Sequence, residues 1–192
     1  VILTSDNGGV DFPGAKIGNI APTQNTPFRS GKGTLYEGGI RVPLMIRWPG
    51  RTKPGTVCGA MVTSQDFFPT LAEGFGHKQA DLPKHDGVSL LSQLRDPKTR
   101  LTRKALYWHY PHYYSRMTPA SAMREGDWKL IHFYEDDQME LFNLREDPSE
   151  TKNVAVTQPA RVRTLRAKLD AWRKDTQAKA PTINPEWRSR KK

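Results

Sequence analysis

The sequence has almost no cysteine, no long apolar run and fewer acidic than basic residues. Cys58 is the only cysteine among 192 residues, which excludes an internal disulfide framework and leaves the redox compartment open. No apolar stretch approaches the about 20 residues of a membrane-spanning helix, so no membrane span is expected. The 30 Lys and Arg residues outnumber the 20 Asp and Glu residues, and a net charge of +10 could attract nucleic acid, anionic membrane or an acidic polymer.

Much of the positive charge lies in residues 161–174 and in the last five residues, Arg188-Ser189-Arg190-Lys191-Lys192. Such runs are typical of a solvated helix face and a loose terminus, so nucleic acid is not expected as a partner. A non-enzymatic binder of anionic polymers, either sulfated glycan or nucleic acid, is the alternative that the charge leaves open. Its binding would weaken steeply with salt.

Aromatic residues indicate a folded core in an otherwise polar chain. The mean hydropathy is −0.71, yet the sequence contains five Trp, six Tyr and seven Phe. The chain does not begin with Met and opens directly on Val1-Ile2-Leu3-Thr4, an apolar run typical of a strand. We therefore expect a portion of a longer protein, in which no secretory signal would be visible.

The first part of the chain has the pattern of an α/β domain with a long loop. Residues 1–5 predict a buried strand, and residues 40–48 predict a second strand that Pro43 places at an edge, at a bulge or at a late start. Between them, residues 10–39 are rich in glycine and proline, which predicts a long irregular loop. Loops of this length in a compact protein are usually functional or disordered.

Shorter elements are expected after the second strand. Residues 57–63 favour a short strand, and Asp66 is a suitable N-cap for a helix that runs to about Glu73. Leucines in residues 90–94 indicate one further helical turn.

After about residue 104 the pattern changes to strand-like segments separated by turns. It predicts an antiparallel meander with strands at 105–110, 121–124, 128–134 and 139–144. Pro159 then begins a helix whose apolar positions would pack on this sheet: Val162, Leu165, Leu169 and Trp172. The fold class is therefore α/β, with expected domains at 1–104, 105–175 and, as a basic tail, 176–192.

The first candidate for chemistry is the pair Asp6-Asn7 at the end of the first apolar strand. A carboxylate and an amide carbonyl are hard oxygen donors that suit calcium or magnesium. Open α/β sheets bind ligands beyond the carboxyl ends of their strands. Taken alone, however, Asn7-Gly8 is more often simply a hairpin turn.

The second candidate is Lys32, which stands between Gly31 and Gly33. The flanking glycines would let the backbone approach a ligand closely, and the ammonium is a compact charge that suits an anionic oxygen. A flexible loop with a solvated lysine is the alternative. A phosphate-binding P-loop is excluded because the Gly-Lys-Ser/Thr ending is absent.

The third candidate is the pair His109 and His112, within the aromatic segment Trp108-His109-Tyr110-Pro111-His112-Tyr113-Tyr114. Imidazoles among aromatic rings would suit sugar binding or acid–base chemistry. Packing between two subdomains is the alternative, and the spacing does not match a zinc-binding helix. The other histidines, His77, His85 and His132, are expected to be surface or satisfied structural groups.

Together these motifs resemble the sulfatase family of the alkaline-phosphatase-like superfamily. The resemblance is carried by Thr4-Ser5-Asp6-Asn7-Gly8, then Gly31-Lys32-Gly33, then Tyr36-Glu37-Gly38-Gly39-Ile40-Arg41-Val42-Pro43, and it continues to about residue 175. It implies that Asp6 and Asn7 coordinate calcium and that Lys32 is a catalytic sulfate ligand. It also implies that Arg41 anchors the loop, and that His109 and His112 lie near the mouth of the active site as substrate contacts.

The chain departs from the family pattern at the nucleophile. Sulfatases use a formylglycine made from the Cys or Ser of a Cys/Ser-x-Pro-x-Arg motif, and neither Cys58 nor any serine here fits that motif. The resemblance therefore implies a C-terminal portion whose nucleophile, together with further acidic ligands, comes from a missing N-terminal part. Such a portion alone is expected to be inactive.

The resemblance implies hydrolysis of sulfate esters, with sulfated carbohydrate as the expected substrate because of the aromatic and histidine segment. Calcium, or alternatively magnesium, would neutralise a sulfate oxygen and help to polarise the nucleophile. The protein is expected to be periplasmic or secreted. The nearest alternative is a phosphonate or phosphate monoester hydrolase of the same superfamily, whose metal site and lysine could be much the same.

Overall fold

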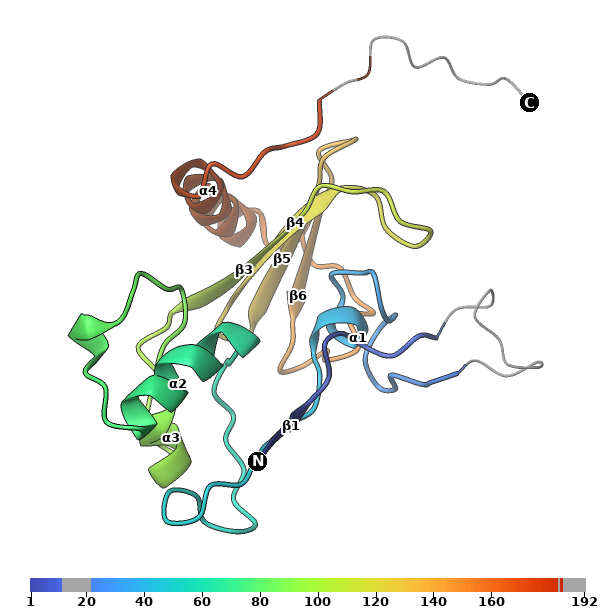
Figure 1. Ribbon diagram of the computed structural model, residues 1–192. Coiled ribbons are helices and arrows are strands. Elements are labelled where there is room, and N and C mark those ends of the chain that lie inside the picture. The colour runs from blue at the N-terminus through green and yellow to red at the C-terminus, as the bar shows by residue number, and fades with distance from the viewer. Residues whose placement is uncertain (12–21, 183, 185–192) are drawn as a thin grey trace. The chain divides into compact units, whose positions relative to one another are not determined.

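The computed structural model describes residues 1–11, 22–182 and 184, and the chain forms two compact units (Figure 1). The first unit comprises residues 1–5 and 43–106, and the second comprises residues 6–42 and 107–192. Residues 6–42 therefore pack with the C-terminal sheet. These units divide the chain at other residues than the predicted domains do, and the domain boundaries stay a prediction. Part of the predicted loop, 12–21, and the end of the predicted basic tail, 185–192, lie outside the described residues.

In the first unit, β1 (Ile2–Thr4) pairs antiparallel with β2 (Leu44–Ile46), with Leu3 opposite Met45. The second strand begins directly after Pro43, which is the late start given among the alternatives for this proline. The prediction of a buried first strand is wrong for this unit, because Ile2 and Leu3 are exposed. Among the described residues β2 is the one strand that pairs with β1 in this sheet.

Short helices complete the first unit: η2 (Ser64–Asp66), α2 (Phe67–Gly74), η3 (Gln79–Asp81) and α3 (Leu91–Arg95). Asp66 occupies the expected N-cap position of α2 but does not cap it with its side chain. Its buried carboxylate instead accepts from the backbone N–H groups of Thr63 and Val88 and pairs with Arg103. The predicted strand at 57–63 is absent. Val57 is 89% exposed, so the start of this segment has no packing that would support a strand.

The second unit contains a sheet in the order β3 (Ala105–Tyr110), β4 (Ala120–Glu125), β5 (Trp128–Phe133), β6 (Met139–Asn143). The pairs β4–β5 and β5–β6 are antiparallel, with Ala122 opposite Ile131 and Leu130 opposite Leu141. This confirms the predicted antiparallel meander and, with the helix described next, the α/β class.

The two faces of this sheet carry different elements because side chains alternate along each strand. On one face, α4 (Pro159–Asp175) buries Leu165 and Leu169, and its Trp172 stacks on Tyr107 with ring centroids 5.0 Å apart. This confirms the helix that was predicted to begin at Pro159. Within the described part of the chain, no helix is long and apolar enough to cross a membrane.

The other face of the sheet packs against residues 34–40, which end in the short helix α1 (Glu37–Ile40). Leu35 and Tyr36 lie in one apolar cluster with strand residues of this face: Ala120, Ala122, Ile131 and Phe142. The sequence predicted that a strand begins at residue 40, and the structure instead places Ile40 at the end of α1. The loop before this helix carries Lys32, so the sheet supports that loop through α1.

His132 joins β5 to α4 as a buried, neutral imidazole. Its Nε2 lies 2.7 Å from Asp137 Oδ1, and its Nδ1 lies 3.2 Å from Arg173 Nη1. A guanidinium only donates, so Nδ1 must accept and Nε2 carries the proton. Burial lowers the pKa of His132 below its usual value of 6.5, and the charge of Arg166 lowers it further against the opposing effect of Asp137.

This pKa predicts acid sensitivity of the contact between sheet and helix. Below about pH 6.5 the unfolded chain binds a proton at His132 more readily than the folded chain does, so the free energy of unfolding should fall between pH 7 and pH 5. Thermal unfolding across this range measures the effect, and His132→Gln should flatten the pH dependence. An equal slope in wild type and variant would contradict the assignment.

Candidate functional site

Asp6 and Asn7 begin the second unit as a bend directly after β1. The Asp6 side chain is exposed, and Asn7 is half-buried with its Nδ2 donating to the carbonyl of Gly8 at 2.9 Å. The amide oxygen of Asn7 is the atom of this side chain that is chemically suited to bind a cation. The turn therefore presents a carboxylate and an amide oxygen.

Backbone hydrogen bonds join the Asp6–Gly9 turn to the loop that carries Lys32 between Gly31 and Gly33, which we call the lysine loop. The N–H of Lys32 donates to the carbonyl of Gly9 at 3.0 Å, and the N–H of Gly8 donates to the carbonyl of Gly39 at 2.9 Å. Gly8 has no room for a side chain, because a Cβ there would overlap the carbonyl of Gly38. The structure thus brings together the segment of the predicted metal ligands and the segment of the predicted sulfate ligand.

A third segment, residues 110–117, lies beside the lysine loop. The ring of Tyr114 covers Gly33, whose φ of +85° and lack of a Cβ permit the contact. The N–H of Leu35 donates to Met117 Sδ at 3.0 Å. His112 is exposed on this segment, with its ring edge-on to Tyr110 at 5.8 Å. The end of the aromatic segment is therefore a neighbour of the loop that carries Lys32.

His109 is engaged at both ring nitrogens. Nδ1 lies 2.9 Å from Ser121 Oγ and 2.9 Å from the hydroxyl of Tyr134, and Nε2 lies 3.0 Å from the carbonyl of Lys179. These partners fit the packing interpretation of His109, which ties β3 to β4 and to the segment after α4. Substrate contact by His109 stays a prediction.

A buried lysine holds α1 on the sheet. Lys129 projects from β5 with none of its side chain exposed, and its Nζ lies 3.0 Å from Glu37 Oε1 and 2.8 Å from Glu150 Oε1. The other oxygen of Glu150 accepts from the backbone N–H of Glu37 at 2.6 Å. One cation and two carboxylates from distant parts of the sequence therefore fix the end of the loop that carries Lys32. We refer to Glu37, Lys129 and Glu150 as the buried charge cluster.

Arginines complete the surroundings of this cluster. Arg41 and Arg124 lie 3.6 and 3.7 Å from Glu37 Oε2, so the implied anchoring role of Arg41 is consistent with its position. Arg29 donates to the carbonyl of Glu150 at 3.1 Å. Burial raises the pKa of Glu150 above its usual range, and the charge of Lys129 opposes that shift. The cluster therefore depends on Lys129 to keep a buried carboxylate ionised.

The donor chemistry of the turn fits part of a calcium site. Calcium binds six to eight oxygens, and Asp6 and Asn7 supply two suitable groups. Within the described part of the chain, no cluster of three or more His, Cys, Asp or Glu side chains is placed to hold a metal ion. A calcium ion at Asp6 and Asn7 would thus need further ligands.

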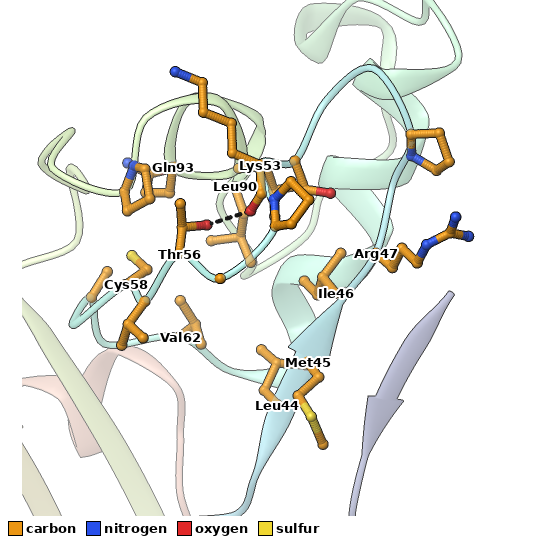
Figure 2. Close-up of a pocket in the computed structure, with 18 residues that line it drawn as sticks. Leu44, Met45, Ile46, Arg47, Lys53, Thr56, Cys58, Val62, Leu90 and Gln93 are labelled. Carbon is orange, nitrogen blue, oxygen red and sulfur yellow. Dashed lines mark hydrogen bonds between the residues drawn. The ribbon is translucent and has the colours of Figure 1, made fainter.

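The first unit contains a separate cavity of about 670 Å³ (Figure 2). Its walls are mainly apolar and include Leu44, Val62 and Leu90, with Lys53 and Gln93 among the polar residues. None of the predicted site residues lines this cavity. The candidate site is therefore the surface formed by the three segments of the second unit.

Comparison with known proteins decides the family. A family model described as N-sulphoglucosamine sulphohydrolase, C-terminal, matches residues 30–177. The chain belongs to the sulfatase family.

Curated sulfatases from several organisms resemble the chain. A protein named sulfatase from Formosa agariphila is 38% identical over 187 residues, which cover 90% of this chain and 32% of the relative. Human arylsulfatase A is 37% identical over 136 residues, or 70% of this chain and 24% of the relative. The chain thus spans about a third or less of the length of these sulfatases.

Solved sulfatase structures share the fold. The chain matches Ps i-CgsB in complex with k-i-k-neocarrahexaose with a TM-score of 0.70 and 26% identity, over 89% of this chain and 35% of that one. It matches BT4656 in complex with D-glucosamine-2-N,6-O-disulfate with a TM-score of 0.63 and 29% identity, over 92% of this chain and 33% of that one. These matches confirm the expected sulfatase fold class.

The buried charge cluster of this sulfatase chain predicts a large effect of Lys129. Lys129→Met would leave two buried carboxylates without their cation and should lower the free energy of unfolding by about 3–5 kcal/mol. The matched control is Lys168→Met, because Lys168 pairs with Glu125 at the surface, where such pairs contribute less than about 1 kcal/mol. Chemical denaturation compares the two. Equal losses would contradict the role assigned to Lys129.

Proposed function

We propose that the protein hydrolyses sulfate esters, with calcium bound at Asp6 and Asn7 and with Lys32 as a ligand of the transferred sulfate. The supporting observation is the pair of backbone hydrogen bonds that hold the Asp6–Gly9 turn against the loop of Lys32. Membership of the sulfatase family supports the reaction class. Sulfatases of several organisms, named for different substrates, are among the relatives.

Each residue has a distinct role in this proposal. When bound, calcium supplies Lewis-acid stabilisation of negative charge on a sulfate oxygen. Asp6 and Asn7 hold it with a carboxylate and an amide oxygen. Lys32 places a fixed positive charge where charge develops on the transferring group or on the leaving oxygen. Both Asp6 and Lys32 are exposed in the described structure, so a substrate can reach them.

The nucleophile is proposed to be a formylglycine contributed by residues outside this chain. No Cys or Ser of the sequence stands in a Cys/Ser-x-Pro-x-Arg motif. The chain spans 32% of its Formosa agariphila relative, which leaves room for that motif elsewhere in a protein of similar length. On this proposal the 192 residues alone do not turn over substrate.

Sulfated carbohydrate is the proposed substrate class. Relatives include an N-acetylglucosamine-6-O-sulfatase and an N-acetylgalactosamine-6-O-sulfatase of Bacteroides thetaiotaomicron. In this chain, the segment with exposed His112 and Tyr113 adjoins the lysine loop through Tyr114. An aromatic and hydrogen-bonding surface beside the sulfate ligand suits a sugar ring.

Lys32 provides the test of the reaction class. Lys32→Ala in the protein of full natural length should lower kcat/KM for a sulfate ester by about 100- to 1,000-fold, because it removes one charged donor from the developing charge. Lys152→Ala, which removes another exposed lysine of the same unit, should leave the rate within about twofold. Matched sulfate and phosphate esters are assayed in parallel. Faster cleavage of the phosphate ester would overturn the sulfatase proposal.

His112 provides the test of the substrate class. His112→Ala should raise KM for a sulfated oligosaccharide by about five- to tenfold, the value of one hydrogen bond, and should change KM for a small aryl sulfate little. His77→Ala, which removes an exposed histidine of the first unit, is the control. Equal kinetics of His112→Ala and wild type on the oligosaccharide would exclude His112 as a sugar contact.

A further inference from the structure

A single side-chain amide, that of Asn25, holds the peptide that connects the two halves of the candidate site. Its Oδ1 accepts from the N–H of Gly9 at 2.9 Å, and its Nδ2 donates to the carbonyl of the same residue at 2.9 Å. The same Nδ2 donates to the carbonyl of Ser30 at 3.0 Å. Asn25 therefore bonds both the N–H and the carbonyl of Gly9 and links them to Ser30, at the start of the lysine loop.

The Gly9 carbonyl is the shared point of this arrangement. It accepts from Asn25 Nδ2 and also from the backbone N–H of Lys32, at 3.0 Å, which uses both of its lone pairs. Asp6 and Asn7 lie only three and two residues before Gly9, respectively, in the same turn. The direction of the Gly9 carbonyl therefore sets where the proposed metal ligands lie with respect to the proposed sulfate ligand.

The geometry requires an amide rather than a carboxylate at this position. Two of the three bonds are donated by Nδ2 to carbonyl oxygens, and one is accepted by Oδ1 from an N–H. Only a side chain that carries both a donor NH₂ group and an acceptor oxygen satisfies this pattern. An aspartate would retain the bond from Gly9 N–H and would place an oxygen against two carbonyl oxygens.

We propose that Asn25 is a positioning residue of the sulfatase site: it orients the Gly9 peptide and thereby sets the spacing between Asp6 and Asn7 on one side and Lys32 on the other. This inference rests on the proposed function for its catalytic consequence. Asn25 is not one of the proposed ligands of the metal or the sulfate. It acts through backbone groups, in the way that outer residues orient the ligands of a metal site.

The experiment measures amide hydrogen exchange by NMR in the protein of full natural length, for Asn25→Ala and Asn25→Asp. The Lys32 amide is the decisive probe, because its partner is the Gly9 carbonyl and Asn25 acts on it through the carbonyls of Gly9 and Ser30. It should exchange at least about tenfold faster in both variants. The exchange rate of the Gly9 amide should rise more in Asn25→Ala than in Asn25→Asp, because an aspartate oxygen can still accept the Gly9 N–H. If the alanine variant fails to fold, Asn25→Asp carries the test.

Calcium titration and turnover supply the second readout. Both variants should bind calcium about 10- to 100-fold more weakly, with kcat falling by a similar factor and KM changing less. The control is Thr23→Ala, which removes a 3.0 Å bond from Thr23 to the carbonyl of Val10, one residue beyond Gly9. This control should keep calcium affinity and kcat within about twofold.

The outcomes separate this inference from the proposed function. If the wild-type protein neither binds calcium nor cleaves sulfate esters, the proposed function fails, and the exchange data alone judge the positioning role. Unchanged exchange at the Lys32 amide in both Asn25 variants overturns that role. Wild-type calcium affinity and turnover in both variants also overturn it, whatever the exchange rates show.

Discussion

The structure of the second unit depends on a buried lysine that must be paired. Lys129 is the second residue of β5 and its side chain is not exposed, and burial of an unpaired ammonium would be prohibitively costly. Its partners are Glu37, at the start of α1, and Glu150, in the connection between β6 and α4. Pairing the charge therefore fixes α1 on the sheet. With α1 held, the loop before it can present Lys32 in a defined place.

A chain of short-range contacts leads from this cluster to the proposed chemistry. Residues 34–40 pack on the apolar face of the sheet, and Gly39 accepts the N–H of Gly8. Asn25 then fixes Gly9, whose carbonyl receives the N–H of Lys32. Each contact joins backbone groups or side chains that are at least half-buried, so the proposed site has a fixed support although Asp6 and Lys32 are exposed. Such preorganisation is what electrostatic catalysis requires.

Local patterns in the sequence predicted the C-terminal sheet and α4 well, the elements of the first unit less well, and the long-range contacts poorly. Alternation predicted strands at 105–110 and 139–144, and the structure has Ala105–Tyr110 and Met139–Asn143. The helix α1 was missed because Glu150, more than a hundred residues away, engages its first N–H. The buried lysine did leave a signal: Lys129 shares its face of β5 with Ile131 and Phe133, which points it into the core. Nothing local marked Asn25 or Glu150, since their partners are defined only by the fold.

The most direct test of the shared site is diffraction from crystals of the full-length protein grown with calcium and an uncleaved sulfate ester analogue. The calcium ion should lie about 2.3–2.6 Å from oxygens of Asp6 and Asn7. The Lys32 ammonium should lie within hydrogen-bonding distance, about 2.7–3.2 Å, of a sulfate oxygen of the same ligand. Calcium bound elsewhere, or Lys32 directed away from the bound sulfate, would contradict a common site for these residues.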